Sequence, residues 1–373
     1  MDIDRRTLMG AALAAGATAS AVSQAGAATP KNRKKRFKKI ATEEAFSIPE
    51  IAAILHDITR TNLTTLDRGV LTLNYGNPDA SVRLHELLDV DAGRLKSMDD
   101  NDVDIHLLSL TSPGVQMFEP NLAADLATLA NDRLAEAISR HPTRYAGLAS
   151  FSPQNPKAAV KEMERAIKTL KLNGFIVNSH TNNEYLDDPK FWPLLEAAEA
   201  LDAAIYIHPR CPSDGMAAPF HIDEGGPANG NLENATWGYA VETGTHAMRL
   251  ILSGVFDRFP RLKIVLGHMG EFIPFNLWRM DYMGGARRNR HIKLNPSEYF
   301  KRNFVITTSG VEHHPALLYS LDVLGEDNVM WAIDYPYQPT TPAVAFMNSA
   351  PISDAVKEKV FHGNAERIFH INI

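Results

Sequence analysis

Residues 39–46 read KIATEEAF, a run typical of a buried strand that ends in two adjacent acids, Glu43 and Glu44. A carboxylate at the end of a buried strand costs free energy unless water, a hydrogen-bond partner or a cation compensates it. Ala45 follows the two acids directly. The stretch therefore indicates a first strand, and at its end a polar group that needs a partner.

Seven further runs of the same kind recur along the chain. They occupy residues 103–113, 144–151, 172–180, 203–210, 262–270, 303–310 and 328–336. The near-continuous apolarity of FIV (175–177) and IYI (205–207) is typical of strands covered on both faces. Several of the intervening segments have helical periodicity, namely 156–171, 189–201 and 314–325.

Eight strands that alternate with helices predict an α/β fold, a (β/α)8 TIM barrel that occupies residues 39–373 as a single domain. The alternative is an open doubly wound sheet. That topology would place a glycine-rich phosphate loop after the first strand, and TEEAFSIPE (42–50) contains none. Residues 51–98 are long for a first connection, so we expect a helical excursion that caps the mouth of the barrel.

The composition limits the possible functions. The 373 residues are 45% hydrophobic and 22% charged, which is ordinary for a globular protein with a full core. A formal net charge of -6 leaves no basic footprint for nucleic acid. Cys211 is the only cysteine, which excludes an internal disulfide and a thiolate metal cluster. Any metal site must therefore use histidines and carboxylates.

Residues 1–27 resemble a cleavable twin-arginine export signal. A pair of arginines precedes a mildly apolar run rich in Ala and Gly, and the segment ends in the small-residue sequence AGA. The run is too short and too rich in Gly, Ser and Thr for a stable span, so we expect no stable membrane insertion. Cleavage after Ala27 predicts a periplasmic or exported protein. We interpret the basic residues 28–38 as a solvated leader rather than a nucleic-acid or membrane patch.

Polar side chains stand at the C-terminal ends of five expected strands. They are Glu43, His180, His208, His268 and Asp334. In a (β/α)8 barrel these ends converge on one site. One such histidine alone is more often a hydrogen-bonded core residue, but a mixed set of imidazoles and carboxylates around one mouth is the ligand inventory of a divalent cation. The sequence therefore predicts a metal-dependent site.

Eight short pieces of the sequence carry a family resemblance. In order they are IATEEAF, LTSPGVQ, VNSHT, YIHP, VETGTHAMRL, GHMGE, TSGV and DYPYQ. Their order and spacing resemble the amidohydrolase superfamily of metal-dependent barrels, and within it the non-oxidative aromatic decarboxylases. These pieces are similar in sequence to γ-resorcylate and 2,3-dihydroxybenzoate decarboxylases and most similar to 5-carboxyvanillate decarboxylases. The resemblance implies a carboxy-lyase of aromatic-compound catabolism that removes CO₂ from a hydroxylated aromatic carboxylate.

The resemblance also implies roles for individual residues. Glu43, His208 and Asp334 are expected to hold one divalent metal ion, Mn²⁺ or Zn²⁺, with Mg²⁺ also compatible with an oxygen-rich set; no organic cofactor is expected. His268 and Glu271 are expected to form a catalytic pair, because a carboxylate beside an imidazole raises the pKa of the imidazole and fixes its orientation. Asp334 is expected to deliver a proton to the carboxyl-bearing ring carbon before CO₂ leaves.

Ala45 bears on the choice of chemistry. Many hydrolases of the superfamily carry His-x-His on the first strand, whereas this chain has Glu43-x-Ala45. Three protein ligands leave open positions on a metal, which a hydroxyl and a carboxylate on adjacent ring carbons could fill. The alternatives are a metal-dependent hydrolase of a lactone, ester or amide, which could use the same ligands, and an exported binding protein without catalysis.

Two further side chains are candidates for binding the substrate. Arg279, in NLWRMDY, offers a bidentate guanidinium to a carboxylate; the alternative is a structural pair with Asp281 on the same helix. His180, in VNSHT, is expected to line the ring pocket. The expected partner is a small aromatic carboxylate, and by analogy with related barrels we expect a homo-oligomer, a dimer or a tetramer.

Overall fold

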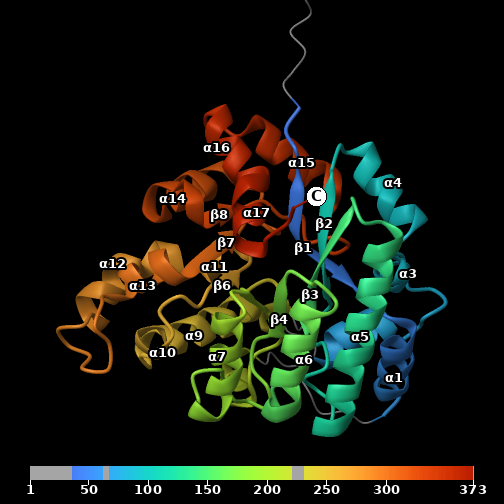
Figure 1. The fold of residues 1–373 in the computed structure, drawn as a ribbon, viewed down its shortest axis with the longest axis horizontal. Coiled ribbons are helices and arrows are strands. Elements are labelled where there is room, and N and C mark those ends of the chain that lie inside the picture. The colour runs from blue at the N-terminus through green and yellow to red at the C-terminus, as the bar shows by residue number, and fades with distance from the viewer. Residues whose placement is uncertain (1–35, 62–66, 221–230, 373) are drawn as a thin grey trace, which may run out of the picture. The chain divides into compact units, whose positions relative to one another are not determined.

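Eight parallel strands lie side by side in chain order in the computed structural model of the protein (Figure 1). They are β1 (Ile40–Phe46), β2 (Ile105–Leu110), β3 (Tyr145–Ser150), β4 (Gly174–Asn178), β5 (Ile205–His208), β6 (Ile264–Leu266), β7 (Phe304–Thr307) and β8 (Val329–Met330). All of their residues are buried except His208, which is partly exposed. The prediction of eight strands is confirmed, and burial on both faces accounts for their apolarity.

The structure describes residues 36–61, 67–220 and 231–372. Its contacts divide the chain into two units, Met1–Arg36 and Phe37–Ile373, and every element described here belongs to the second. The expected signal sequence, residues 1–27, and most of the expected leader, residues 28–35, lie outside the described residues. Within the described part, no helix is long and apolar enough to cross a membrane.

Backbone hydrogen bonds join β1 to the segment that follows β8. Thr42 N donates to Trp331 O over 3.2 Å, and Ala45 N donates to Tyr335 O over 2.8 Å. The Thr42 hydroxyl donates to Trp331 O as well, over 2.8 Å. These bonds complete a nearly closed barrel, and the strand order excludes the open doubly wound alternative.

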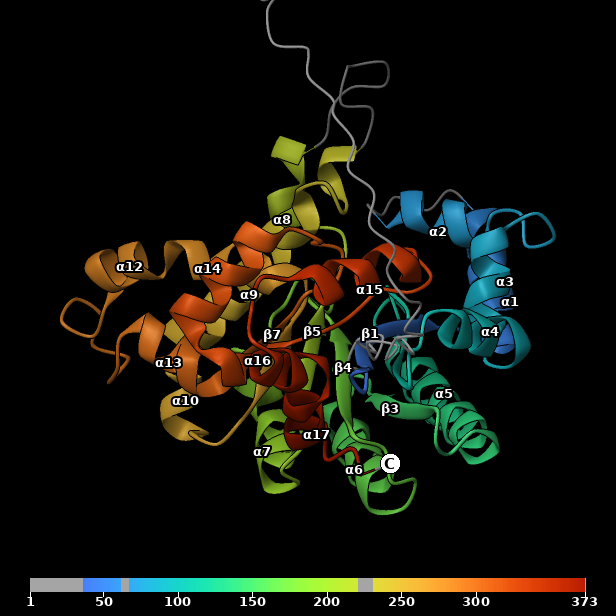
Figure 2. The ribbon, with the colours of Figure 1, turned by 90° about the horizontal axis from the view of Figure 1, so that it is seen from above.

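Helices supply the connections and pack on the outside of the strands, as α5 does against β3 (Figure 2). The α-helices are α1 (Pro49–Thr59), α2 (Arg68–Tyr75), α3 (Val82–Leu88), α4 (Ala92–Asp100), α5 (Pro120–Arg140), α6 (Pro156–Lys168), α7 (Trp192–Ala200), α8 (Asp214–Ala217), α9 (Gly238–Leu252), α10 (Val255–Arg258), α11 (His268–Glu271), α12 (Ile273–Gly284), α13 (Pro296–Asn303), α14 (His314–Leu324), α15 (Thr340–Ser349), α16 (Asp354–Glu358) and α17 (Asn364–Phe369). Short turns of other helix types are η1 (Pro189–Phe191), η2 (Ala218–Phe220), η3 (Asn231–Glu233), η4 (Glu326–Asn328) and η5 (Lys359–Gly363).

The helix boundaries follow from local sequence. Pro120 stands in the first turn of α5, where a backbone N–H would have no helical partner. The buried face of α5 recurs every three or four positions, at Ala123, Leu126, Ala127, Ala130, Asn131, Leu134 and Ala137. At the start of α6, Asn155 Oδ1 accepts the N–H of Ala158 over 3.3 Å and caps the helix. Such helices bury one face against the barrel and leave the other exposed.

The barrel interior is filled at one end by apolar side chains. Ile40, Leu107 and Tyr206 belong to a buried cluster with side chains from the other strands, and Ile368 and Phe369 of α17 join it. A packed core of this kind is not a pore, so the chemistry of a barrel lies beyond the C-terminal ends of its strands.

The long first connection is helical, as expected, and consists of α1 to α4. Asp67, which precedes α2, forms an ion pair with Arg210 in the segment after β5. Asn74 of α2 donates to the hydroxyl of Tyr337, in the segment after β8, over 3.0 Å. The excursion therefore contacts loops at the C-terminal ends of two strands, which is where the sequence placed it.

Candidate metal centre

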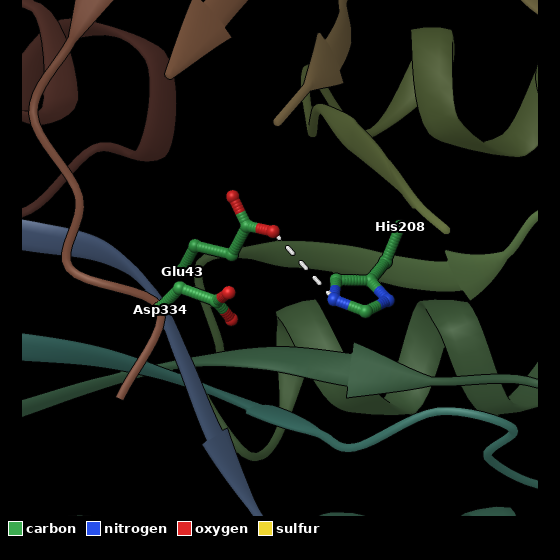
Figure 3. Close-up of side chains that lie close together, drawn as sticks. All are labelled: Glu43, His208 and Asp334. Carbon is green, nitrogen blue, oxygen red and sulfur yellow. Dashed lines mark ion pairs between the residues drawn. The ribbon is translucent and has the colours of Figure 1, made fainter. Parts of the chain in front are cut away.

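Three predicted residues from distant parts of the chain come together beyond the strand ends (Figure 3). Glu43 lies on β1, His208 ends β5 and Asp334 follows β8. One ligand atom from each lies within 4.8 Å of the other two. His208 Nε2 is 3.5 Å from Glu43 Oε1, and Figure 3 shows both carboxylates directed toward the imidazole. The group has the composition and spacing of a site for one divalent cation.

The two carboxylate oxygens of Glu43 have different surroundings. Oε2 accepts hydrogen bonds from the hydroxyls of Tyr206, Thr307 and Ser309, the Thr307 bond being 3.0 Å long. Oε1 is buried and has no hydrogen-bond partner among the described residues. Burial would raise the pKa of Glu43, but the imidazoles of His268 and His208 hold it below its usual value. Glu43 is therefore an ionised carboxylate with one oxygen fixed and the other directed into the group, as a metal ligand requires.

The backbone determines which nitrogen of His208 faces the site. Its Nδ1 lies 2.8 Å from the carbonyl oxygen of Pro209. Because a carbonyl oxygen can only accept, Nδ1 must carry the proton and Nε2 must hold the lone pair. Nε2 is the atom nearest Glu43. A histidine ligand oriented through its second nitrogen in this way is the usual arrangement at metal sites.

Asp334 reaches the group from an unusual backbone conformation. It is buried, and its φ of 77° lies in the left-handed region, which residues other than glycine rarely adopt. Burial raises the pKa of its carboxyl above the ordinary value, and the nearby imidazole of His268 opposes that rise. A conformation of this cost persists only where the surroundings impose it.

His268 and Glu271 form the predicted pair, but not through a helix. His268 Nδ1 donates to Glu271 Oε1 over 2.8 Å. Residues 268–272 all have positive φ and make a left-handed turn before α12. That turn brings the side chains together because its glycine, at φ 78°, needs no Cβ clearance.

His268 also faces the carboxylates of the three-residue group. Its Nε2 is 3.8 Å from Glu43 Oε1 and 3.9 Å from Asp334 Oδ2. Burial would lower the pKa of His268, but the charges of Glu271 and Glu43 raise it well above its usual value. His268 is therefore placed to exchange a proton with Asp334.

Comparison with known proteins decides the family. The amidohydrolase family profile matches residues 81–371 of this chain. The chain belongs to the amidohydrolase family.

Three relatives of this amidohydrolase are similar over nearly its whole described length. The 5-carboxyvanillate decarboxylase from Sphingomonas paucimobilis is 52% identical, with a TM-score of 0.85, and the match covers 90% of this chain and 100% of that one. The 5-carboxyvanillate decarboxylase from Novosphingobium aromaticivorans, complexed with manganese and 4-hydroxy-3-methoxy-5-nitrobenzoic acid, is 37% identical over 90% of this chain and 96% of that one, with a TM-score of 0.81. The γ-resorcylate decarboxylase from Rhodococcus jostii is 36% identical over 90% of this chain and 99% of its own length.

In this amidohydrolase His180 lies beside the strand ends with both ring nitrogens engaged. Nε2 lies 3.2 Å from the carbonyl oxygen of Cys211, and Nδ1 accepts the N–H of Asn183 over 3.3 Å. Burial, aided by the charge of Arg210, lowers the pKa of His180 to about 4. His180 is therefore a neutral imidazole held by the backbone, and any contact with a substrate would involve its ring face.

Arg279 is not brought to the metal centre. It lies on the exposed face of α12 and makes no ion pair or hydrogen bond with any described residue. The alternative pair with Asp281 does not form either, because Asp281 instead accepts from the backbone N–H and the hydroxyl of Ser297, over 2.9 and 2.6 Å. The expected role of Arg279 in substrate binding therefore has no support from contacts with the described residues of one chain.

The three hydroxyls that hold Glu43 were not predicted from the sequence. Tyr206 stands two positions before His208 on β5, so strand alternation places both side chains on the same face. Thr307 and Ser309 have the same spacing at the end of β7, in TTSG. The period-two pattern was a usable signal, but the pairing with Glu43 depends on how the strands are arranged around the barrel.

Proposed function

We propose that the protein is a metal-dependent, non-oxidative decarboxylase of hydroxylated aromatic carboxylates. The observation that carries this proposal is the group of Glu43, His208 and Asp334, with a free oxygen on Glu43 and a free Nε2 on His208. The group occurs in a chain that is 52% identical to a 5-carboxyvanillate decarboxylase. Such enzymes are carboxy-lyases, and no organic cofactor takes part.

Glu43, His208 and Asp334 would hold one divalent ion, and manganese is the first choice because structures of two related decarboxylases contain it. When bound, the ion would orient the ring hydroxyl and carboxylate and withdraw electron density from the ring. The donor set fits, since one imidazole and two carboxylates form an oxygen-rich site.

The protein's own residues supply the proton. Asp334 delivers it to the ring carbon that bears the carboxyl group, which interrupts the aromatic π system. The electron pair of the C–C bond then returns to the ring, and CO₂ leaves. His268 stands with Nε2 3.9 Å from Asp334 Oδ2 and Nδ1 bonded to Glu271, so it can return a proton to Asp334 for the next turnover.

A substrate panel tests the function. Purified protein loaded with Mn²⁺ is incubated with 5-carboxyvanillate, γ-resorcylate and 2,3-dihydroxybenzoate, and CO₂ is measured against loss of substrate. Aryl esters and lactones form the parallel arm for the hydrolase alternative. We expect CO₂ in stoichiometric yield from 5-carboxyvanillate or a close relative, and no acid release from the esters. Acid release without any CO₂ would contradict the proposal.

We also propose that a second copy of this chain covers the exposed face of α12. Phe275, Trp278 and Tyr282 lie at helical spacing on this face and are 78%, 75% and 60% exposed. At roughly 150–250 Å² per aromatic side chain, these three offer on the order of 400 Å². That is about half of the ~800 Å² that one partner contributes to a stable interface. An apolar groove of about 590 Å³, lined by residues of α9 and α12, adjoins the face and adds to it.

Arg279 lies on this same face, next to Trp278, and we propose that its guanidinium binds the substrate carboxylate in the site of the second copy. Co-expression of R279A and D334N chains tests this. In a two-fold dimer with shared sites, half of the dimers are mixed and each has one complete site, so about a quarter of wild-type activity returns. If each site were built from one chain, the mixture would be no more active than its components. Sedimentation of W278E against wild type tests the interface itself.

For residues 1–27 we propose a twin-arginine export signal, and therefore a periplasmic or exported mature protein. Support comes from the arginine pair, the Ala/Gly-rich run and the AGA sequence. Fractionation of cells that express the full chain is expected to give a mature form that begins at residue 28 outside the cytoplasm. The double variant R5K/R6K is expected to hold the protein inside, and equal export of both forms would contradict the proposal.

A further inference from the structure

Glu44, the second acid of KIATEEAF, faces away from the metal centre. Strand alternation places it on the side opposite Glu43, where it is fully buried. Glu44 Oε1 accepts the N–H of Ile333, and Oε2 accepts the N–H of Tyr335, each over 3.0 Å. Each oxygen of Glu44 thus accepts one backbone N–H of the segment that follows β8.

These two amides stand on either side of Asp334. A third contact, from Ala45 N to Tyr335 O over 2.8 Å, ties the same turn to β1. Asp334 itself has a φ of 77°, a conformation that residues other than glycine rarely adopt. Both neighbours of Asp334 in the chain are therefore attached through their N–H groups to one buried side chain, and the residue between them is the strained one.

We propose that Glu44 is a positioning residue for Asp334. The carboxylate of Glu44 accepts the N–H groups of Ile333 and Tyr335 and so fixes the direction in which the Asp334 side chain enters the site. The role of Asp334 in metal binding and proton delivery rests on the proposed function. In KIATEEAF, the first acid would thus supply an oxygen to the site, while the second, on the opposite face of β1, aligns the carboxylate of Asp334.

A merely structural role would predict something different. If Glu44 only joined β1 to the segment that follows β8, its loss would lower the free energy of unfolding in the same way as the loss of any other hydrogen bond between these two segments. Thr42 provides the matched control. Its hydroxyl donates to Trp331 O between the same two segments and contacts neither of the amides beside Asp334. T42V keeps the shape of the side chain and removes that bond.

The test compares E44Q with T42V. In E44Q the amide oxygen can still accept one N–H, but the new NH₂ group faces the other donor. One of the two hydrogen bonds to the residues beside Asp334 is therefore lost. Residues that orient metal ligands in this way change metal affinity or activity by about 10–100-fold. We expect the Mn²⁺ dissociation constant of E44Q, measured by equilibrium dialysis on folded protein, to rise by about tenfold or more. We expect the kcat of E44Q to fall by a similar factor and its KM to change by less. We expect the Mn²⁺ dissociation constant, kcat and KM of T42V to stay within about twofold of the wild-type values.

A crystal structure of E44Q supplies a readout that depends on neither metal nor turnover. Asp334 is expected to leave the positive-φ region or to turn its carboxylate away from Glu43. If the wild type binds Mn²⁺ but releases no CO₂, the proposed function fails while the Mn²⁺ comparison still decides the role of Glu44. Should E44Q not fold, E44D keeps the charge with the oxygens drawn back by one methylene and takes its place. Unchanged Asp334 geometry together with T42V-like affinity would overturn the proposal.

Discussion

The ion pair between Asp67 and Arg210 offers a stringent test of how the mouth of the barrel is held. Arg210 stands two residues after His208, and Asp67 precedes α2, so the pair joins the excursion to the loop beyond β5. The two side chains are only 3% and 6% exposed. Arg210 Nη1 also donates to His180 O over 3.2 Å. The perturbation is D67N, which keeps the shape of the side chain and removes its charge.

Loss of one partner removes the ion pair and leaves the other charge buried. For pairs of this burial the cost is about 3–5 kcal/mol, whereas removal of both charges is often nearly neutral. We therefore expect D67N to lower the free energy of unfolding by about 3 kcal/mol, R210M to lower it by a similar amount, and the double variant to lose far less than the sum. The expected coupling energy is about 2–3 kcal/mol.

The assay is urea unfolding followed by tryptophan fluorescence for the four proteins of the cycle. The exposed pair of Glu50 and Arg133, whose side chains are 36% and 44% exposed, provides the matched control. There E50Q is expected to cost less than about 1 kcal/mol. Additive losses at Asp67 and Arg210, with a coupling energy below about 0.5 kcal/mol, would refute the reasoning that burial makes this pair strong.

Four further outcomes are expected. Burial raises the pKa of the Cys211 thiol, so iodoacetamide should label it only after unfolding, as mass spectrometry would show; rapid labelling of native protein would contradict its burial. Burial lowers the pKa of His246 to about 3, so the unfolded chain binds the extra proton and stability falls as pH drops from about 6.5 toward 3; about 2 kcal/mol of unfolding free energy should be lost by pH 5, and H246Q should lose less. D334N should remain folded and release no CO₂, and substantial turnover with metal bound would rule out Asp334 as the acid. Removal of metal by EDTA should abolish CO₂ release and added Mn²⁺ should restore it, whereas full activity of metal-free protein would exclude metal dependence.

Much of the fold and of the metal centre was predictable from the sequence, for a geometric reason. Parallel strands in a barrel end on one rim, so polar residues that directly follow apolar runs must approach one another. Glu43, His208 and Asp334 satisfied that condition, and the structure brings them together. The topology gathers the polar residues at one rim, whereas the choice of these three as the metal ligands came from the family resemblance.

The supporting contacts were not predictable in the same way. The bond between Tyr206 and Glu43 depends on strand arrangement, which no local pattern encodes. The pair of His268 and Glu271 was expected from the family resemblance, but the left-handed turn that brings the two side chains together was not. Arg279 carried a suitable functional group, but its direction depends on which face of α12 packs inward, and the structure leaves it exposed. The chemical type of each candidate side chain could be predicted from the sequence, whereas the direction in which it points required the packed structure.

The central claim is that CO₂ leaves the aromatic ring and that a proton takes its place on the same carbon. Decarboxylation of 5-carboxyvanillate by the Mn²⁺-loaded protein in D₂O tests it most directly, with CO₂ counted and the aromatic product examined by NMR. We predict one CO₂ per substrate consumed and one deuterium in the product, at the carbon that had carried the lost carboxyl group. Substrate consumed without CO₂, or a product with no deuterium at that carbon, would contradict the account.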